Sequence, residues 1–212
     1  MRRAIFGGSF DPVHNGHLRI AEAARAAFDL ERVIFMPAHL SPHKAISREA
    51  PQSAQVGATH RPPYLGAEER CLLIRAAIKD NPYFELSTHE LDRGGVSYTV
   101  DTLLASGACE EAPIYCIIGA DLAPRLGEWH KPLELARLAR FIAAARDGQI
   151  PEAPPPFHLE HFACPEIAVS SSMIRERIAA GQSVRSLVPD AVFELICAHN
   201  FYAGGKPRNA DD

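Results

Sequence analysis

The chain has 212 residues, 47% of them hydrophobic, and its 26 Asp and Glu outnumber its 22 Lys and Arg, for a formal net charge of −4. This composition excludes a disordered chain and argues against the basic surface with which proteins hold nucleic acids. A chain of this length buries a core without disulfides. We therefore expect one domain over residues 1–203 and a disordered tail over residues 204–212.

The sequence gives no sign of a membrane segment or of a disulfide framework. No apolar run approaches the roughly 18 residues that a membrane helix needs. Five cysteines (Cys71, Cys109, Cys116, Cys164 and Cys197) form no CxxC pair. We expect reduced thiols in a cytoplasmic protein with no membrane or nucleic-acid partner. A homo-oligomer is compatible with the sequence, but no feature of it fixes the oligomeric state.

Strand and helix patterns alternate along the chain. Residues 3–6 predict a strand, which a glycine loop joins to a helix over residues 16–28. A strand at 32–37 precedes a long loop and a helix at 67–79. Further strands are predicted at 84–87, 114–118, 140–145 and 157–163, and further helices at 99–106, 132–138, 172–180 and 189–199. This alternation predicts an α/β fold, a doubly wound and mostly parallel sheet with a small C-terminal helical part, whose ligands bind beyond the carboxyl ends of the strands.

The glycine loop, GGSFDPVHNGH at residues 7–17, is the first candidate site. Its glycines allow close backbone approach, and the helix that follows offers unpaired N–H groups to an anion such as phosphate. His14 and His17 are three residues apart, so both rings can face one ligand. A local turn in which the histidines only cap or pack remains an alternative. A zinc site with Asp11 is a weaker one, because no third ligand has the spacing of a metal site. The loop matches neither GxGxxG nor GK[ST].

Later motifs narrow the interpretation. They are SPHK at residues 41–44, GVSYTVDTL at 95–103, IGAD at 118–121 followed by Trp129, and VSSSMIR at 169–175. With the first loop, this set resembles the bacterial nicotinate-nucleotide adenylyltransferases of the HxGH nucleotidylyltransferase superfamily, from about residue 3 to residue 202. The resemblance implies a Rossmann-like fold and transfer of the adenylyl group of ATP to nicotinate mononucleotide. The products would be nicotinate adenine dinucleotide, which is deamido-NAD, and pyrophosphate, with Mg²⁺ held mainly by the ATP phosphates.

The resemblance also implies roles for individual residues. His17, His14 and Lys44 are the expected catalytic residues, with both histidines facing the α-phosphate. The serines before the last-but-one helix, with Arg175, would hold the β- and γ-phosphates, although an ordinary helix cap with a solvated arginine explains the same residues. The residues expected to bind ATP are Gly7, Gly8, Ser9, Phe10, His14, His17, Gly119, Asp121, Ser171, Ser172, Ile174 and Arg175.

The second substrate is expected to contact Trp129, Thr99, Lys44 and Arg146. The indole of Trp129, the only tryptophan, suits stacking on a pyridine ring, although most lone tryptophans are core residues. By resemblance, Thr99 at a helix start receives the nicotinate carboxylate. Lys44 and Arg146 would reach phosphate groups, but each could instead be a solvated surface charge.

Two features depart from the family pattern. The segment 47–66 is longer than expected and is predicted to be a mobile loop, and Ser172 replaces a threonine while keeping its hydroxyl. Alternative functions are adenylyl transfer to nicotinamide mononucleotide or phosphopantetheine, cytidylyl transfer, and a non-catalytic nucleotide-binding regulator.

Overall fold

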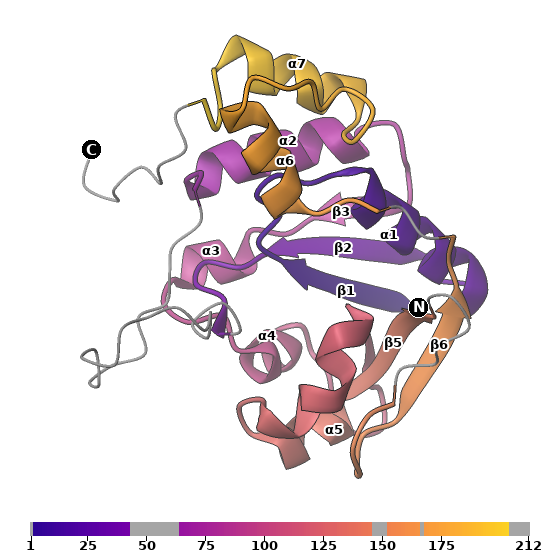
Figure 1. Cartoon of the computed structure of the whole chain (residues 1–212). Coiled ribbons are helices and arrows are strands. Elements are labelled where there is room, and N and C mark those ends of the chain that lie inside the picture. Colours follow the sequence, from indigo (N-terminus) through magenta and orange to yellow (C-terminus); the bar gives the residue numbers. More distant parts are fainter. Residues whose placement is uncertain (1, 43–63, 146–151, 166–167, 204–212) are drawn as a thin grey trace, which may run out of the picture.

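A six-stranded sheet forms the centre of the molecule (Figure 1). The computed structural model describes residues 2–42, 64–145, 152–165 and 168–203. The strand order is β3-β2-β1-β4-β5-β6, and every neighbouring pair is parallel. The predicted doubly wound α/β fold is therefore confirmed. The order reverses between β1 and β4, so the carboxyl ends of these two strands form the crevice where such folds bind ligands. The strands are β1 (Arg3–Gly8), β2 (Arg32–Pro37), β3 (Phe84–Leu86), β4 (Ile114–Ile118), β5 (Ala139–Ala145) and β6 (Leu159–Ala163).

Helices cover both faces of the sheet (Figure 1). One face packs against α1 (Asn15–Phe28), α2 (Ala67–Ile78), α6 (Ser171–Ala179) and α7 (Asp190–Ala198). The other packs against α4 (Thr99–Ala105), the 3-10 helix η2 (Ala120–Glu128) and α5 (Pro132–Leu138). The short helix α3 (His89–Arg93) follows β3.

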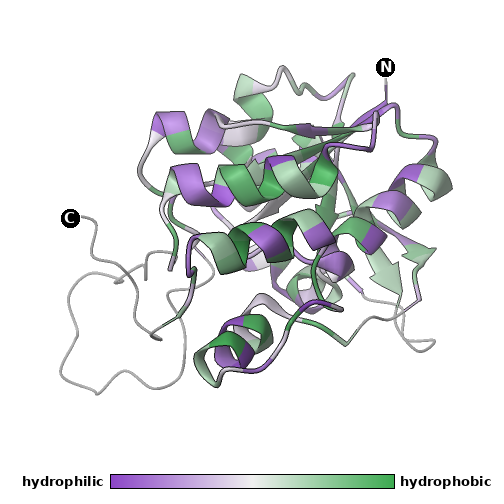
Figure 2. Ribbon diagram, turned by 90° about the horizontal axis from the view of Figure 1, so that it is seen from above, coloured by the Kyte–Doolittle hydropathy of each residue, from purple (hydrophilic) through white to green (hydrophobic). Residues whose placement is uncertain are grey.

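The strand sequences explain why both faces are covered. In β1, Ala4 and Phe6 enter the hydrophobic cluster on the α1 side, whereas Ile5 enters the cluster on the α4 side. A parallel strand that is apolar on both faces needs a helical layer on each. The helices of these layers carry hydrophobic and hydrophilic residues side by side, as Figure 2 shows from above.

Each predicted strand and helix is present in the structure. The boundaries differ by one or two residues; for example, the strand predicted at 157–163 begins at Leu159. Two elements were not predicted. The helix α3 has only five residues, too few to show a period, and η2 contains Pro124 and lacks the 3.6-residue repeat of an α-helix.

Some predictions fall outside the described residues. These are Lys44, Arg146, the tail at 204–212 and all but the last three residues of the predicted loop at 47–66. All five cysteines are free. Among the described residues, no helix is long and apolar enough to cross a membrane.

Candidate active site

The two histidines of the glycine loop hold each other at the start of α1. His14 is the N-cap residue, and its Nδ1 accepts a hydrogen bond from the backbone N–H of His17 at 3.4 Å. The Nδ1 of His17 accepts in turn from the backbone N–H of His14 at 3.2 Å. The rings stack with centroids 3.7 Å apart. Both side chains therefore cap the helix, and the predicted placement of both rings on one side of the loop is observed.

This reciprocal cap fixes which nitrogen of each ring carries a proton. Because each Nδ1 accepts a backbone N–H, we infer that the proton of each ring lies on Nε2, which makes Nε2 the donor atom. His14 is 6% exposed, and burial lowers the pKa of its ring to about 4. His14 is thus a neutral donor at pH 7.

The glycine between the histidines is required by space. A Cβ on Gly16 would lie 2.9 Å from Cγ1 of Val169 and 3.0 Å from Nδ1 of His14. The first distance is shorter than real Cβ contacts, so any larger residue would displace the His14 ring or the segment before α6. Close packing of α1 against this segment explains the HxGH pattern physically.

Phe10 supports His17 from the core. Its backbone adopts a φ of 47°, in the left-handed region, and its side chain is 1% exposed. The ring packs edge-on against His17, with centroids 5.0 Å apart, and against Phe6 and Phe35. The side chain of Phe10, an expected ATP ligand, therefore faces the hydrophobic core and limits the movement of His17.

The serines at the start of α6 lie against the glycine loop. Ser170 is the N-cap of α6 and accepts from the backbone N–H of Met173, which is the structural alternative for that residue. Ser171 donates its hydroxyl to the carbonyl of Pro12 at 2.9 Å. Ser172 accepts a hydrogen bond from Nη2 of Arg175 at 3.0 Å. The structure thus brings this helix start to the histidine loop.

Arg175 is held in place by the same loop. Its Nη1 donates to the carbonyl of Asp11 at 2.6 Å, and its guanidinium lies 4.4 Å from the ring centroid of Tyr64. Three carbonyls of the loop accept from side chains: Ser9 from Arg70, Asp11 from Arg175, and Pro12 from Ser171.

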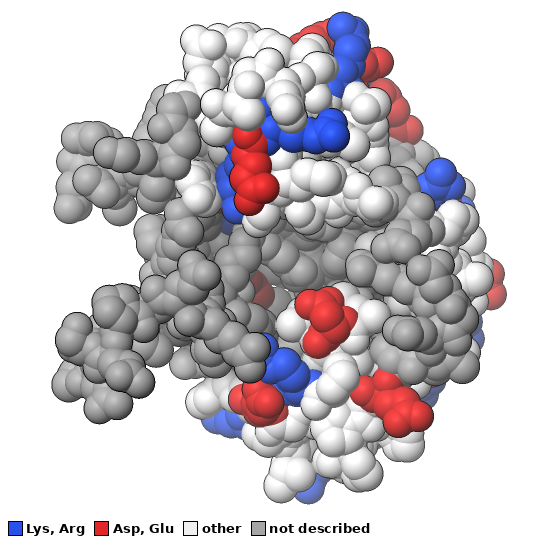
Figure 3. Space-filling model, in the orientation of Figure 1, with Lys and Arg blue, Asp and Glu red and all other residues white. Residues whose placement is uncertain are grey.

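A cavity of about 350 Å³ lies at the carboxyl ends of β1 and β4, on the face that Figure 3 shows to be hollowed. We call it the nucleotide cavity. Its wall includes seven of the predicted site residues, namely Gly7, Gly8, Ser9, Thr99, Gly119, Asp121 and Trp129. The charged residues of the described ranges that line it are two carboxylates, Glu90 and Asp121.

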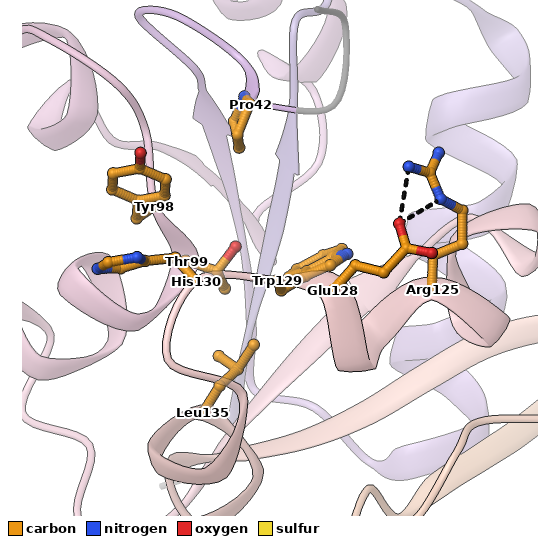
Figure 4. Close-up of a pocket in the computed structure, with 8 residues that line it drawn as sticks. All are labelled: Pro42, Tyr98, Thr99, Arg125, Glu128, Trp129, His130 and Leu135. Atoms are coloured by element: carbon orange, nitrogen blue, oxygen red, sulfur yellow. Dashed lines mark hydrogen bonds and ion pairs between the residues drawn. The ribbon is translucent and has the colours of Figure 1, made fainter. Parts of the chain in front are cut away.

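A second cavity, of about 290 Å³, adjoins the first (Figure 4). The two share Pro42, Thr99 and Trp129 in their linings. Its rim carries a stacked pair of rings, Tyr98 and His130, with centroids 4.2 Å apart. Across the cavity in Figure 4, Arg125 pairs with Glu128 at 2.9 Å. Trp129 packs edge-on against Phe141, so the indole is part core and part cavity wall.

Gly119 leaves room for the carboxylate of Asp121. A Cβ at Gly119 would lie 2.6 Å from Oδ1 of Asp121, so the carboxylate folds back over the backbone of the glycine. Asp121 lies in the first turn of η2, whose N-cap is Gly119, and it is therefore not the helix cap that was the alternative for it. A carboxylate fixed in this way can accept hydrogen bonds from ribose hydroxyls.

The predicted residues thus fall into two adjoining groups, the cavity wall and the histidine loop with the start of α6. Ile174 is next to the second group in the sequence, but its side chain is fully buried in the core. Its backbone N–H donates to the carbonyl of Ser170. Among the described residues, no cluster of three His, Cys, Asp or Glu could hold a metal ion.

The sequence analysis missed three residues at this site. Glu90 is 6% exposed, lines the nucleotide cavity and accepts a hydrogen bond from the hydroxyl of Thr102 at 2.6 Å. Asp11 is 1% exposed and was considered only as a metal ligand. Arg70 is 2% exposed and follows two glutamates, so it resembles a surface charge. Its helical spacing to Leu73 and Ile74, which are fully buried, is the signal that could have placed it on the inner face of α2.

Sequence comparisons identify the family of this chain and its named relatives. The model of a family described as cytidylyltransferase-like matches residues 5–177. A Dehalococcoides mccartyi protein named "Probable nicotinate-nucleotide adenylyltransferase" is 35% identical over 215 residues, covering 95% of this chain and 97% of that protein. A Geobacillus kaustophilus protein of the same name is 40% identical over 191 residues, covering 89% of this chain and 80% of that protein.

Solved structures share the fold. The nicotinic acid mononucleotide adenylyltransferase of Plasmodium falciparum, complexed with NaAD, has a TM-score of 0.67 at 16% identity and covers 95% of this chain and 97% of that one. The same enzyme complexed with APC has a TM-score of 0.64.

Proposed function

Because the chain belongs to the cytidylyltransferase-like family, with relatives named as nicotinate-nucleotide adenylyltransferases along nearly its full length, we propose that it transfers the adenylyl group of ATP to nicotinate mononucleotide. The products are nicotinate adenine dinucleotide and pyrophosphate, so the enzyme acts in NAD biosynthesis. The observation that carries this proposal is the reciprocally capped His14 and His17 beside a cavity that Trp129 and Thr99 line.

The reaction is an in-line displacement. A phosphate oxygen of nicotinate mononucleotide forms a bond to the α-phosphorus of ATP, and the bond from that phosphorus to the oxygen bridging to the β-phosphorus breaks. Pyrophosphate leaves with the bonding electron pair. Because the attacking phosphate is already ionised at pH 7, no general base is needed, and catalysis consists of positioning and charge stabilisation.

The residues of the histidine loop supply the stabilisation. Nε2–H of His14 and of His17 donate to oxygens of the α-phosphate, and Lys44 adds a positive charge at the transferred group. Ser171, Ser172 and Arg175 hold the β- and γ-phosphates, and Asp121 accepts from a ribose hydroxyl. Arg175 is held by the Asp11 carbonyl and Ser172, so its fork is oriented before ATP arrives.

The second substrate binds on the side of Trp129 and Thr99. The pyridine ring stacks on the indole, and the hydroxyl and backbone N–H of Thr99 receive the carboxylate. Arg146 reaches the phosphate of the mononucleotide. Thr99 begins α4, and the hydrogen bond between Glu90 and Thr102 of that helix holds it against α3.

Mg²⁺ is the proposed cofactor, held mainly by the phosphate oxygens of ATP. The donor set fits this arrangement, because no group of three His, Cys, Asp or Glu in the described part of the chain could hold the ion by itself. Bound with ATP, the ion neutralises part of the triphosphate charge. The five free thiols support a cytoplasmic location.

The test is release of pyrophosphate from Mg-ATP by the purified protein, with nicotinate mononucleotide, nicotinamide mononucleotide or phosphopantetheine as acceptor. We expect release with the first and much less with the second. Equal use of both pyridine mononucleotides would keep the reaction and refute the role of Thr99. ATP binding without release for any acceptor would favour a binding-only regulator.

A further inference from the structure

A buried arginine lies directly behind the glycine loop. Nη1 of Arg70 donates to the carbonyl oxygens of Ser9 and Ala38, both at 2.9 Å. Ser9 follows β1 and Ala38 follows β2, and these strands are neighbours in the sheet. Both residues also line the nucleotide cavity. One guanidinium therefore joins the carboxyl ends of two adjacent strands and is separated from the cavity only by the main chain of its wall.

The charge of this guanidinium is only partly compensated. Its buried Nε has no hydrogen-bond partner among the described residues. Asp11 is the carboxylate that acts on it most strongly, but the Asp11 oxygens already accept from the N–H of Tyr64 at 2.6 Å, the N–H of Leu65 at 3.3 Å and the hydroxyl of Tyr202 at 2.9 Å. Burial lowers the pKa of Arg70, yet an arginine stays charged at neutral pH because its ordinary pKa exceeds 12.

Arg175, which the proposed function places at the β- and γ-phosphates, does not line the nucleotide cavity. The lining of this cavity includes the carboxylates of Glu90 and Asp121 and no lysine or arginine from the described part of the chain. A triphosphate binds well only where the local potential is positive. The charge of a buried group acts over several ångströms, because the protein interior screens it less than water does.

We propose that Arg70 is a positioning residue of the adenylyl transfer, whose buried charge attracts and orients the triphosphate of ATP through the wall of the cavity without touching it. This inference rests on the proposed function. Two unit charges about 10 Å apart in a partly buried site interact strongly enough to change binding about tenfold. Because the interaction grows with the charge of the ligand, ATP depends on it most, AMP less, and adenosine hardly at all.

Calorimetric titration with adenosine, AMP and ATP tests the proposal. The variants are Arg70→Gln, Arg70→Met, which leaves no unpaired donor in the core, and Arg70→Lys, which keeps the charge. For Arg70→Gln and Arg70→Met we expect the dissociation constant of ATP to rise about tenfold and that of adenosine less than about twofold. Arg70→Lys should keep most of the preference for ATP over adenosine. Arg75→Gln is the matched control, because it removes the same charge from an exposed position of the same helix.

Two outcomes overturn the proposal. An equal loss of affinity for ATP and adenosine would mean that Arg70 only holds the fold together, as would an Arg70→Lys variant that behaves like Arg70→Met. Should Arg70→Gln and Arg70→Met both fail to fold, Arg70→Lys decides, since a charge role requires an ATP-to-adenosine preference close to that of the unmodified protein. A protein that binds ATP but releases no pyrophosphate would refute the proposed function alone, whereas Arg70 variants that treat ATP and adenosine alike refute this inference alone.

Discussion

Each of His14 and His17 accepts, through its Nδ1, the backbone N–H of the other. The pair thus satisfies two of the unpaired donors at the start of α1 and places the proton of each ring on Nε2. These two hydrogen bonds therefore link the capping of α1 to catalysis. A substitution of either histidine should affect both the stability of the protein and its turnover.

Removal of the His17 ring should reduce turnover far more than stability. For His17→Ala we expect turnover to fall by about 10² to 10³, the usual effect of losing one donor to a developing charge. Pyrophosphate release measures it. His158→Ala, at an exposed histidine, is the control and should keep full turnover. Full turnover in His17→Ala would show that His17 does not take part in the reaction.

The stability of the protein should fall in acid because His14 resists protonation. Between pH 6.5 and about 4, the unfolded chain binds a proton at this residue and the folded chain does not. Stability therefore decreases as pH falls through this window, by up to about 3 kcal/mol from this group.

Urea unfolding at a series of pH values measures this slope. His14→Asn keeps a capping side chain and removes the imidazole, so its stability should change less between pH 6.5 and 4. His158→Asn should retain the full slope, and an identical slope in His14→Asn would contradict the assignment.

Gly16→Ala should inactivate the enzyme while leaving the fold intact. Alanine is the better helix former by about 1 kcal/mol, but its Cβ would push against Val169 and the His14 ring. We expect a large loss of turnover with a small change in melting temperature. Gly127→Ala is the control, since its Cβ would meet only Pro154 at 3.5 Å. Unchanged turnover in Gly16→Ala would show that the ring can move without cost.

Gly119→Ala should act through Asp121. The added Cβ displaces the Asp121 carboxylate, so the KM for ATP should rise, as it should in Asp121→Asn. Since both changes remove one interaction, their combined effect should be smaller than the product of the two single effects. Steady-state kinetics of the three variants measure this, and a full product of effects would mean that Gly119 acts independently.

Trp129 should report binding of the second substrate. It is the only tryptophan and lies in the wall of both cavities. Stacking of a pyridine ring on the indole should quench its fluorescence when nicotinate mononucleotide is added, and adenosine should have little effect. No quenching at saturating nicotinate mononucleotide would show that the pyridine ring does not stack on Trp129.

The sequence predicts those parts of this molecule that depend on local patterns. The apolar runs of β1 and β4 and the helical period of α1 set the sheet and its connections, so the carboxyl ends of these strands could be identified as the site. Thr99 and Trp129, assigned to one substrate by resemblance, do line the same cavities.

What the sequence does not predict depends on contacts between distant segments. Asp11 and Tyr202 form a buried hydrogen bond across 191 positions, and no local pattern connects them. Arginine is a residue type that usually lies at the surface, and only the packing of α2 against the sheet shows that the side chain of Arg70 is buried. The helix η2 was not predicted because it contains a proline and because a 3-10 helix lacks the 3.6-residue period of an α-helix.

The Asp11 to Tyr202 hydrogen bond has a consequence for how the protein is made. During synthesis the glycine loop leaves the ribosome before its partners, because the groups that bond its backbone and Asp11 lie later in the sequence, at Arg70, Ser171, Arg175 and Tyr202. A nascent chain that stops before α7 contains all six strands and the partners at Arg70, Ser171 and Arg175, but it lacks Tyr202. The Asp11 carboxylate therefore gains its third hydrogen-bond donor only after α7 has been translated.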